Sequence, residues 1–207
     1  MDPLDVTVVV ATYGDDEWAE LAHERAVPSA EALGAYVVSV HGPSLHEARN
    51  AGLGLAHTEW VIHLDADDEL EPGYLDEMAT GTADLRAPAV RYIMGPGRKW
   101  GTRVPRVAGH NHHDCRAECL LDGNYLVVGT FARTELLRNA GGWRDWPLYE
   151  DWDLWLRCYL AGATVETIPR AVYRAHVRAD SRNRAPSREL KDATHRAIVT
   201  DVLGARA

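Results

Sequence analysis

The sequence predicts an α/β fold, with one domain built on a mostly parallel central sheet flanked by helices. The main observation is a β-α-β-α-β pattern, in which apolar runs at 6–11, 36–40 and 60–64 alternate with helical segments. These runs are rich in β-branched residues, which is typical of strands buried on both faces of a parallel sheet. Right-handed crossovers would bring the ends of the first and third strands to the same edge.

The helical segments between these strands carry their own signals. Apolar residues recur at helical spacing from 17 to 33, and Pro28 must kink this helix or divide it in two. Ser44 is placed to cap a second helix that runs to about Ala56. A short helix is expected at 72–78.

The elements after this point are shorter. We expect strands at 87–94, 124–128, 164–168 and 171–175, turns at 95–106 and 129–133, and helices at 134–140, 151–161 and 187–203. The last helix is amphipathic, and no linker separates it from the rest of the chain. We therefore assign the domain to 1–184 and expect a C-terminal helix, within 185–207, to pack on it.

Composition argues against several classes of protein. The net charge of -9 disfavours generic binding to nucleic acid or to an anionic membrane, because phosphate-rich partners favour clustered Lys and Arg. No apolar run approaches the roughly 20 residues of a membrane helix, and the N-terminus lacks a signal-peptide profile. Three cysteines are too few for a disulfide framework, so we expect a reducing, cytoplasmic setting, in which a Cys115–Cys119 disulfide is disfavoured.

An acidic cluster follows the third strand. The apolar run at 60–64 ends directly in Asp65, Asp67 and Asp68. Ligands of open α/β sheets bind beyond the carboxyl ends of the strands, and carboxylate oxygens suit hard cations such as Mg²⁺ or Mn²⁺. The cluster therefore fits a site where a divalent ion meets a phosphorylated ligand. Taken alone, it fits equally well a solvated turn ahead of the helix that begins near Pro72.

A second acidic stretch lies at 143–155. It contains four of the seven tryptophans together with four carboxylates, and Asp151 falls at the start of its apolar helix. An acid in the first helical turn is favourable to the helix dipole, which is a sufficient structural reason for it. The functional interpretation is a general base set in an aromatic wall on which sugars stack.

A group of potential metal ligands lies at 110–119, and comprises His110, His112, His113, Cys115 and Cys119. Their spacing matches neither a zinc finger nor a metallohydrolase. An ordinary loop is the favoured interpretation, ahead of a substrate-facing polar loop, and a zinc site is the least favoured.

Three blocks of sequence follow one another in a characteristic order. They are VTVVVATYGD at 6–15, EARNAGLGLAHTEWVIHLDADDEL at 47–70, and a segment that runs from Gly-Gly-Trp at 141–143 to EDWDLWLR at 150–157. With these blocks the chain resembles the inverting glycosyltransferases of family 2, which have the GT-A fold. The resemblance implies a hexosyltransferase that moves a sugar from a nucleotide-diphosphate sugar to an acceptor hydroxyl.

On the donor side, the resemblance implies a UDP-, GDP- or dTDP-sugar. Thr12, Tyr13 and Asp15 would contact its nucleotide, Arg49 would line the same pocket, and Asp65 would face the ribose or the diphosphate.

The resemblance also implies a Mn²⁺ or Mg²⁺ ion. Asp67 would hold it with Asp65 beside it, and Asp68 would be a third acid near the ion. His176 would reach the diphosphate or the metal.

On the acceptor side, the resemblance makes Asp151 the base that takes the proton from the attacking hydroxyl. Glu150 would orient either Asp151 or the acceptor. The acceptor itself could be a glycan, a protein, a lipid or a small molecule.

The turn after the second strand departs from the family pattern. Relatives carry an Asp-Asp-Gly-Ser type turn whose acid reads the base, whereas this chain has His41-Gly42-Pro43-Ser44. The departure leaves the nucleotide base open, and one interpretation is a base pocket that uses His41.

Three alternatives compete with this interpretation. A nucleotidyltransferase that makes activated sugars should carry a basic, Gly-rich loop after the first strand, which Thr12-Tyr13-Gly14 is not. A phosphatase with an aspartyl nucleophile normally has its DxD near the N-terminus. An inactive GT-A-like module that binds carbohydrate or nucleotide-sugar would have no need of intact Asp65, Asp67 and Asp151.

Overall fold

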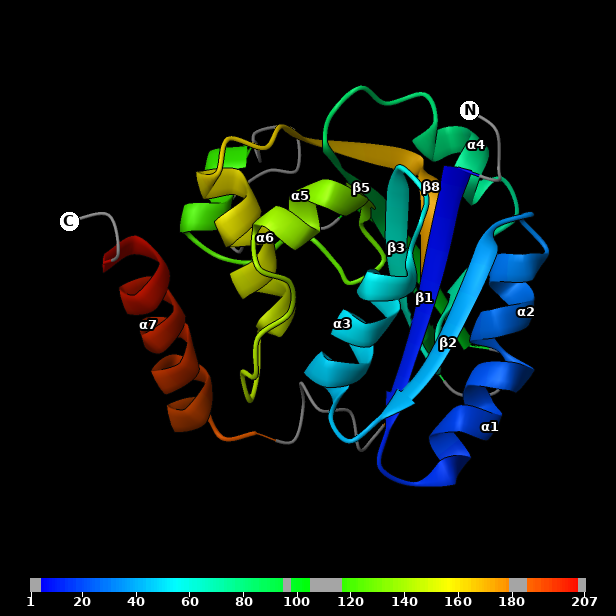
Figure 1. The fold of residues 1–207 in the computed structure, drawn as a ribbon, viewed down its shortest axis with the longest axis horizontal. Coiled ribbons are helices and arrows are strands. Elements are labelled where there is room, and N and C mark those ends of the chain that lie inside the picture. The colour runs from blue at the N-terminus through cyan, green and yellow to red at the C-terminus, as the bar shows by residue number, and fades with distance from the viewer. Residues whose placement is uncertain (1–4, 95–97, 105–116, 179–185, 205–207) are drawn as a thin grey trace.

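A computed structural model describes residues 5–94, 98–104, 117–178 and 186–204, with only the backbone for 98–101. The strands in these ranges are β1 (Val6–Tyr13), β2 (Tyr36–Gly42), β3 (Trp60–Asp65), β4 (Glu69–Leu70), β5 (Leu85–Met94), β6 (Arg98–Arg103), β7 (Phe131–Arg133) and β8 (Val165–Val177). They form one sheet in the order β2-β1-β3-β7-β5-β8-β4, with β6 paired to β5 (Figure 1). The long pairings β1–β2, β1–β3 and β5–β8 are parallel, and the shorter pairings are antiparallel.

The described helices are α1 (Asp16–Glu24), α2 (Ala26–Glu31), α3 (Leu45–Leu55), α4 (Tyr74–Met78), α5 (Thr134–Asn139), α6 (Glu150–Leu160) and α7 (Arg188–Gly204), together with the 3₁₀ turn η2 (Ala117–Leu121). Because β2 and β3 lie on opposite sides of β1, right-handed crossovers place α1–α2 and α3 on opposite faces of the sheet. Figure 1 shows α3 together with α5, α6 and α7 on one side, and α1 and α2 on the other. The expected α/β fold is confirmed.

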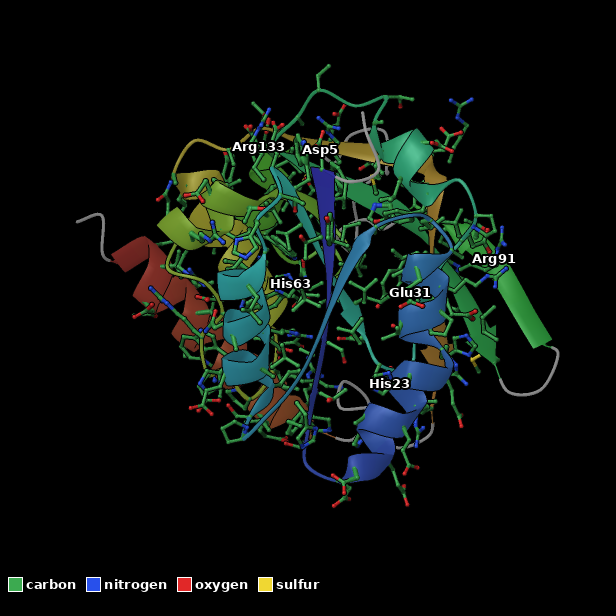
Figure 2. All side chains as sticks on the ribbon, turned by 45° about the vertical axis from the view of Figure 1, so that its right-hand side comes forward. Asp5, His23, Glu31, His63, Arg91 and Arg133 are labelled. Atoms are coloured by element: carbon green, nitrogen blue, oxygen red, sulfur yellow. The ribbon has the colours of Figure 1, made fainter. Side chains whose placement is uncertain are left out.

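The carboxyl ends of the first three strands meet at one edge, as expected. Thr12 on β1 lies opposite His41 on β2, and Ala11 lies opposite Asp65 on β3. In Figure 1 this edge lies at the bottom, where β1 and β2 end. Asp5 and Arg133, labelled in Figure 2, mark the opposite edge, where β1 and β3 begin.

Two expectations about the first half need correction. β2 is an edge strand with exposed and half-buried side chains, and is not buried on both faces, because only β1 pairs with it in the described sheet. The first helical segment divides at Arg25 and not at Pro28. Pro28 lies in the first turn of α2, where the missing backbone N–H costs no helical hydrogen bond.

The second half differs more from the expectation. Residues 124–128 form no strand, and the strand β7 occupies 131–133, where a turn was expected. The predicted turn-rich segment contains β6, which pairs with β5 as a hairpin. The two short strands expected at 164–168 and 171–175 are one strand, β8, whose register against β5 slips between Ile168 and Val172. The slip contains Pro169, which cannot donate to a sheet ladder.

β7 joins the two parallel parts of the sheet through aromatic packing. Phe131 stacks on Trp60 of β3, with 4.6 Å between the ring centroids. The guanidinium of Arg86, on β5, lies 4.2 Å from the centroid of the Trp60 ring. The short strand is therefore held by side chains from both of its neighbours.

The C-terminal helix α7 packs against α6. Ile198 and Val202 are buried, and the ring of His195 stacks on Trp152, with 4.6 Å between the centroids. Arg144 also pairs with Asp201 at 2.5 Å. The division of the chain into 1–184 and 185–207 stays a prediction. Among the described helices, none has the length and apolar character needed to cross a bilayer.

Two glycines of α3 offer a matched test of how closely this helix approaches β1. A Cβ on Gly52 would lie 2.2 Å from Cγ1 of Val9, whereas a Cβ on Gly54 would meet nothing within 4 Å. We predict that Gly52→Ala lowers the free energy of unfolding by about 1–3 kcal/mol through overpacking. Gly54→Ala is expected to raise it by about 0.5–1 kcal/mol through helix propensity. Urea unfolding of both variants measures the difference. Equal effects would contradict the close packing of α3 against β1 at Gly52.

Candidate active site

A cavity of about 190 Å³ lies where the end of β3 faces the start of α6. Its acidic part is formed by Asp65, Asp68, Glu150 and Asp151, and Arg49 lies among them. Its apolar part is formed by residues of β5, β8 and the segment before β7: Val90, Tyr92, Val127, Val128, Tyr173 and Ala175. The cavity thus brings together two acids from each of the two stretches that the sequence singled out.

Arg49 joins the two groups of acids. Its side chain is buried, and its Nη2 donates to Oδ1 of Asp65 at 2.9 Å, while its Nη1 donates to Oε1 of Glu150 at 3.0 Å. The guanidinium also lies 4.3 Å from the centroid of the Trp143 ring. Burial alone would lower the pKa of Arg49, but the charges of Asp65 and Glu150 outweigh it and raise the pKa. One buried cation thus holds the end of β3 against the start of α6.

The residue after Arg49 holds the loop that carries Trp143. Asn50 donates to the carbonyl of Trp143 and accepts from its N–H, both at 2.8 Å. Gly142 has a φ of 67°, and a Cβ at this position would lie 2.4 Å from Oδ1 of Asn50. The Arg-Asn pair of one sequence block and the Gly-Gly-Trp of another therefore form a single packed unit.

His63 supports this unit from inside the protein, beside α3 (Figure 2). The indole N–H of Trp143 donates to Nε2 of His63 at 3.1 Å. Since an indole N–H only donates, Nε2 accepts and the imidazole proton lies on Nδ1. Burial, and then the charge of Arg49, lower the pKa of His63 to about 3, so the ring is neutral.

Asp68 has a structural role that its sequence position does not reveal. Its carboxylate is buried and accepts from the hydroxyl of Tyr173 at 2.6 Å and from the backbone N–H of His176 at 2.7 Å. Burial, followed by the charges of Asp65 and Asp67, raises the pKa of Asp68 well above its usual range. Asp68 therefore ties the acidic turn to β8.

Asp67 is half-buried in the same turn. Arg25, the N-cap residue of α2, binds the backbone of this turn. Nη1 of Arg25 donates to the carbonyl of Asp67 at 2.8 Å. Burial and the charge of Asp65 raise the pKa of the Asp67 carboxyl. The turn therefore concentrates negative charge beside the end of β3.

The described residues contain no group of three or more His, Cys, Asp or Glu placed to share one metal ion. The ring of His176, expected near the metal, lies with its Nε2 2.7 Å from Oε2 of Glu69. Its assignment as a ligand stays a prediction. Of the His/Cys group at 110–119, only Cys119 falls in the described residues, and its side chain is buried. The other members lie outside the described residues.

Asp151 faces the cavity from the first turn of α6. Asn124 donates to its Oδ2 at 2.8 Å, and the N–H of Trp152 donates to its Oδ1 at 2.8 Å. Burial and the adjacent charge of Glu150 raise the pKa of Asp151 to about 7. A carboxylate with this pKa can take up and release a proton near neutral pH.

The backbone ahead of Asp151 is strained. Tyr149, at the N-cap of α6, has a φ of 61°, which is the only positive φ of a non-glycine residue in the described part of the chain. Such a conformation costs of order 1–3 kcal/mol and persists only where the surroundings enforce it. Here the following turn is fixed, because Arg49 holds Glu150 and Asn124 holds Asp151.

Residues expected to contact the nucleotide lie together at the ends of β1 and β2. Thr12 is buried, and its hydroxyl lies 3.0 Å from Nδ1 of His41. Tyr13 is 39% exposed, and Asp15 is exposed at the N-cap of α1 without a side-chain capping bond. The side chains of Tyr13 and Asp15 are thus available at the same sheet edge as Asp65, whereas the side chain of Thr12 is covered.

Sequence reasoning missed several supporting residues. Asn124 was expected in a strand, and Tyr173 has the appearance of an ordinary strand residue, so neither carried a signal. Asn50 stands inside a characteristic block, next to Arg49, but its role depends on Trp143, which is distant in sequence.

The buried imidazole makes a testable contribution to the pH dependence of stability. The pKa of His63 is about 3 in the folded chain, against 6.5 for an ordinary histidine, so protons bind the unfolded chain preferentially. The free energy of unfolding therefore falls as the pH drops below 6.5. Gln accepts from an indole N–H without titrating. We predict that His63→Gln reduces the loss of stability between pH 7 and pH 5 by about 2 kcal/mol.

Urea unfolding at the two pH values measures this loss. His57→Gln, at an exposed histidine, is the matched control for the substitution itself. An unchanged loss in His63→Gln would contradict a buried neutral imidazole.

Comparisons with known proteins identify the family and the fold of this chain. The model of glycosyl transferase family group 2 matches residues 60–196, which is more than half of the chain. No curated protein gives a significant sequence match. Crystal structures of S. aureus TarS 1-349 are similar in fold, with a TM-score of 0.65 and 15% identity for the complex with UDP-GlcNAc. For the complex with UDP, the TM-score is 0.59 and the identity 14%.

The chain spans only part of these relatives. The alignment with the UDP-GlcNAc complex covers 93% of this chain and 65% of the TarS chain. The alignment with the UDP complex covers 95% of this chain and 64% of the TarS chain. At such low identity the likeness establishes the fold, which is of the GT-A type. Together with the match to the family model, it shows that this chain belongs to glycosyl transferase family group 2.

Proposed function

We propose that the chain is a metal-dependent, inverting glycosyltransferase that moves a sugar from a nucleotide-diphosphate sugar to an acceptor hydroxyl. The observation that carries the proposal is the division of the acids around Arg49. Asp65 pairs with one side of its guanidinium and Glu150, next to Asp151, with the other. A donor site that uses Asp65 and a base at Asp151 can therefore lie side by side, each with its own carboxylates.

The donor would lie at the ends of β1 and β3. Thr12, Tyr13, Asp15 and His41 are the proposed contacts of its nucleotide. TarS, which shares the fold, has been crystallised with UDP-GlcNAc and with UDP, and this supports a UDP-sugar ahead of a GDP- or dTDP-sugar.

The residues at this edge fit a divalent ion. Mg²⁺ is usually held by one or two carboxylates, with substrate phosphates and waters completing its shell. Asp65 and Asp67 provide two carboxylates. Burial, and then the charge of Asp65, raise the pKa of Asp67, and a bound cation would offset that charge. A bound Mn²⁺ or Mg²⁺ would stabilise the charge that grows on the departing diphosphate. The Nε2 of His176 could join these ligands only by leaving Glu69.

Asp151 is the proposed base. It would take the proton of the acceptor hydroxyl while that oxygen bonds to the anomeric carbon, and the bond to the diphosphate would break on the opposite side with its electron pair. This single displacement inverts the anomeric centre. Glu150, fixed by Arg49, would orient the base or the acceptor.

The first test removes the proposed metal ligand. We predict that Asp67→Ala abolishes the Mn²⁺-dependent part of UDP binding, because one of the two carboxylates is lost. Isothermal titration calorimetry with and without Mn²⁺ measures it. Asp76→Ala, at an exposed acid of α4, is the control. If Asp67→Ala and the wild type bind UDP with equal Mn²⁺-dependent affinity, Asp67 does not hold the metal.

The second test removes the proposed base. Asp151→Asn should keep donor binding and lower kcat by about 10²- to 10⁴-fold, the range of general-base catalysis. Asp145→Asn changes an exposed acid of the same stretch and should leave kcat unchanged. Undiminished turnover in Asp151→Asn would exclude this base.

The pH dependence of the wild type tests the same assignment. Because the base acts deprotonated and its pKa is raised to about 7, kcat/KM should rise with pH up to about pH 7 and then level off.

The raised pKa of Asp151 also affects stability. Above about pH 4 the folded chain retains a proton on Asp151 that the unfolded chain loses, so this carboxyl lowers the free energy of unfolding as the pH rises toward 7. Asp151→Asn should therefore lose less stability between pH 5 and pH 8 than the wild type.

A further inference from the structure

Asn124 contacts the proposed base through an amide whose orientation is fixed. Its Oδ1 accepts from the backbone N–H of Leu126 at 3.1 Å, so its Nδ2 is the group that faces Asp151. The nitrogen of a carboxamide donates and does not accept. Asn124 can therefore give a hydrogen bond to Oδ2 of Asp151 but cannot accept one from it.

This orientation determines which form of Asp151 the contact stabilises. A hydrogen bond donated to a carboxylate favours the charged form, whereas a bond accepted from a carboxylic acid favours the neutral form. The two oxygens of Asp151 accept from Asn124 and from the backbone N–H of Trp152, each at 2.8 Å. Since both partners only donate, both contacts favour Asp151 without its proton.

The segment that carries Asn124 is anchored on both sides. On the side toward η2, the indole N–H of Trp152 donates to the carbonyl of Leu120 at 2.8 Å. On the side toward β7, the hydroxyl of Tyr74 donates to the carbonyl of Gly129. Asn124 therefore lies between two fixed points, one of which belongs to the same turn of α6 as Asp151.

Other groups also act on the proton affinity of Asp151. Burial and then the charge of Glu150 raise its pKa. The N–H of Trp152, the charge of Arg49 and the amide of Asn124 lower it. Further titratable groups at the cavity, or on α7 where it packs on α6, are Asp65, Asp68, Tyr92, Tyr149, Tyr173, Asp192 and His195. A substitution at Asn124 leaves all of these groups in place.

We propose that Asn124 is a positioning residue for Asp151, and that its donor-only contact keeps this carboxyl in the form that accepts a proton. This inference rests on the proposed function, in which Asp151 is the base. A carboxylate has about four lone-pair positions, of which Asn124 and Trp152 occupy one each. The others remain for the acceptor hydroxyl, on which Asn124 acts only through Asp151.

The direct test is the titration of the Asp151 carboxyl, followed by carbon NMR on the full chain. Asp151→Asn identifies the signal by its loss. We expect Asn124→Ala to move the midpoint to higher pH by at least about one unit, because the carboxylate loses a donor and the acid loses no acceptor. Leu121→Ala, at an exposed side chain of the same segment, is the matched control and should leave the midpoint unchanged.

A second variant keeps the shape of the side chain. Asn124→Asp retains an acceptor for the N–H of Leu126 but replaces the donor by a second acid. Two carboxyls in contact share a proton, so the pair should hold its last proton to a higher pH than Asp151 does in the wild type. This variant tests the contact even where Asn124→Ala does not fold. A wild-type midpoint in either folded variant, or an equal shift in Leu121→Ala, would overturn the proposal.

Release of nucleoside diphosphate from UDP-, GDP- and dTDP-sugars, with water as the acceptor, tests the proposed function separately. If a donor is cleaved, the acid limb of kcat/KM should move with the NMR midpoint in Asn124→Ala. A limb that stays in place while the midpoint moves would overturn the role of Asn124 in the reaction.

The two readouts separate the two failures. If the midpoint moves as expected but no donor is cleaved at any pH, the proposed function fails and the control of Asp151 by Asn124 stands. If a donor is cleaved and the midpoint does not move, only the role of Asn124 fails.

Discussion

The buried guanidinium of Arg49 is the interaction on which the rest of the site depends. It holds Asp65 at the end of β3 and Glu150 at the start of α6, and its face lies against Trp143. Removing either partner of a buried ion pair leaves an uncompensated charge, which is strongly destabilising. The two carboxylates share this cation, so the geometry of the proposed donor edge and the geometry of the proposed base are physically linked.

Much of the fold and the main acids could be predicted from the sequence because their signals are local. The buried runs of β1 and β3, the Ser44 cap and the acids after β3 each follow from residue type and spacing. Asp151 was recognisable because a carboxylate at a helix start stands out in an aromatic stretch. The family resemblance rested on these same blocks, and the family match agrees with it.

The remaining features depend on contacts between distant segments. Asp68 looks like Asp67 in sequence, yet Tyr173 and the backbone of His176 bind it on β8. β7 is only three residues long and is held by the stacking of Phe131 on Trp60. β2 has the composition of a buried strand but lies at the edge, and strand order cannot be read from composition. The raised pKa of Asp151 likewise comes from burial in the assembled cavity.

A double-mutant cycle on the free energy of unfolding, with Asp65→Asn, Glu150→Gln and both together, tests the central claim most directly. Each single variant leaves Arg49 one carboxylate, whereas the double variant leaves a buried guanidinium without either. We expect the double variant to be destabilised beyond the sum of the two single variants by at least about 1 kcal/mol. Additivity within about 0.5 kcal/mol would show that Arg49 does not couple the end of β3 to the start of α6.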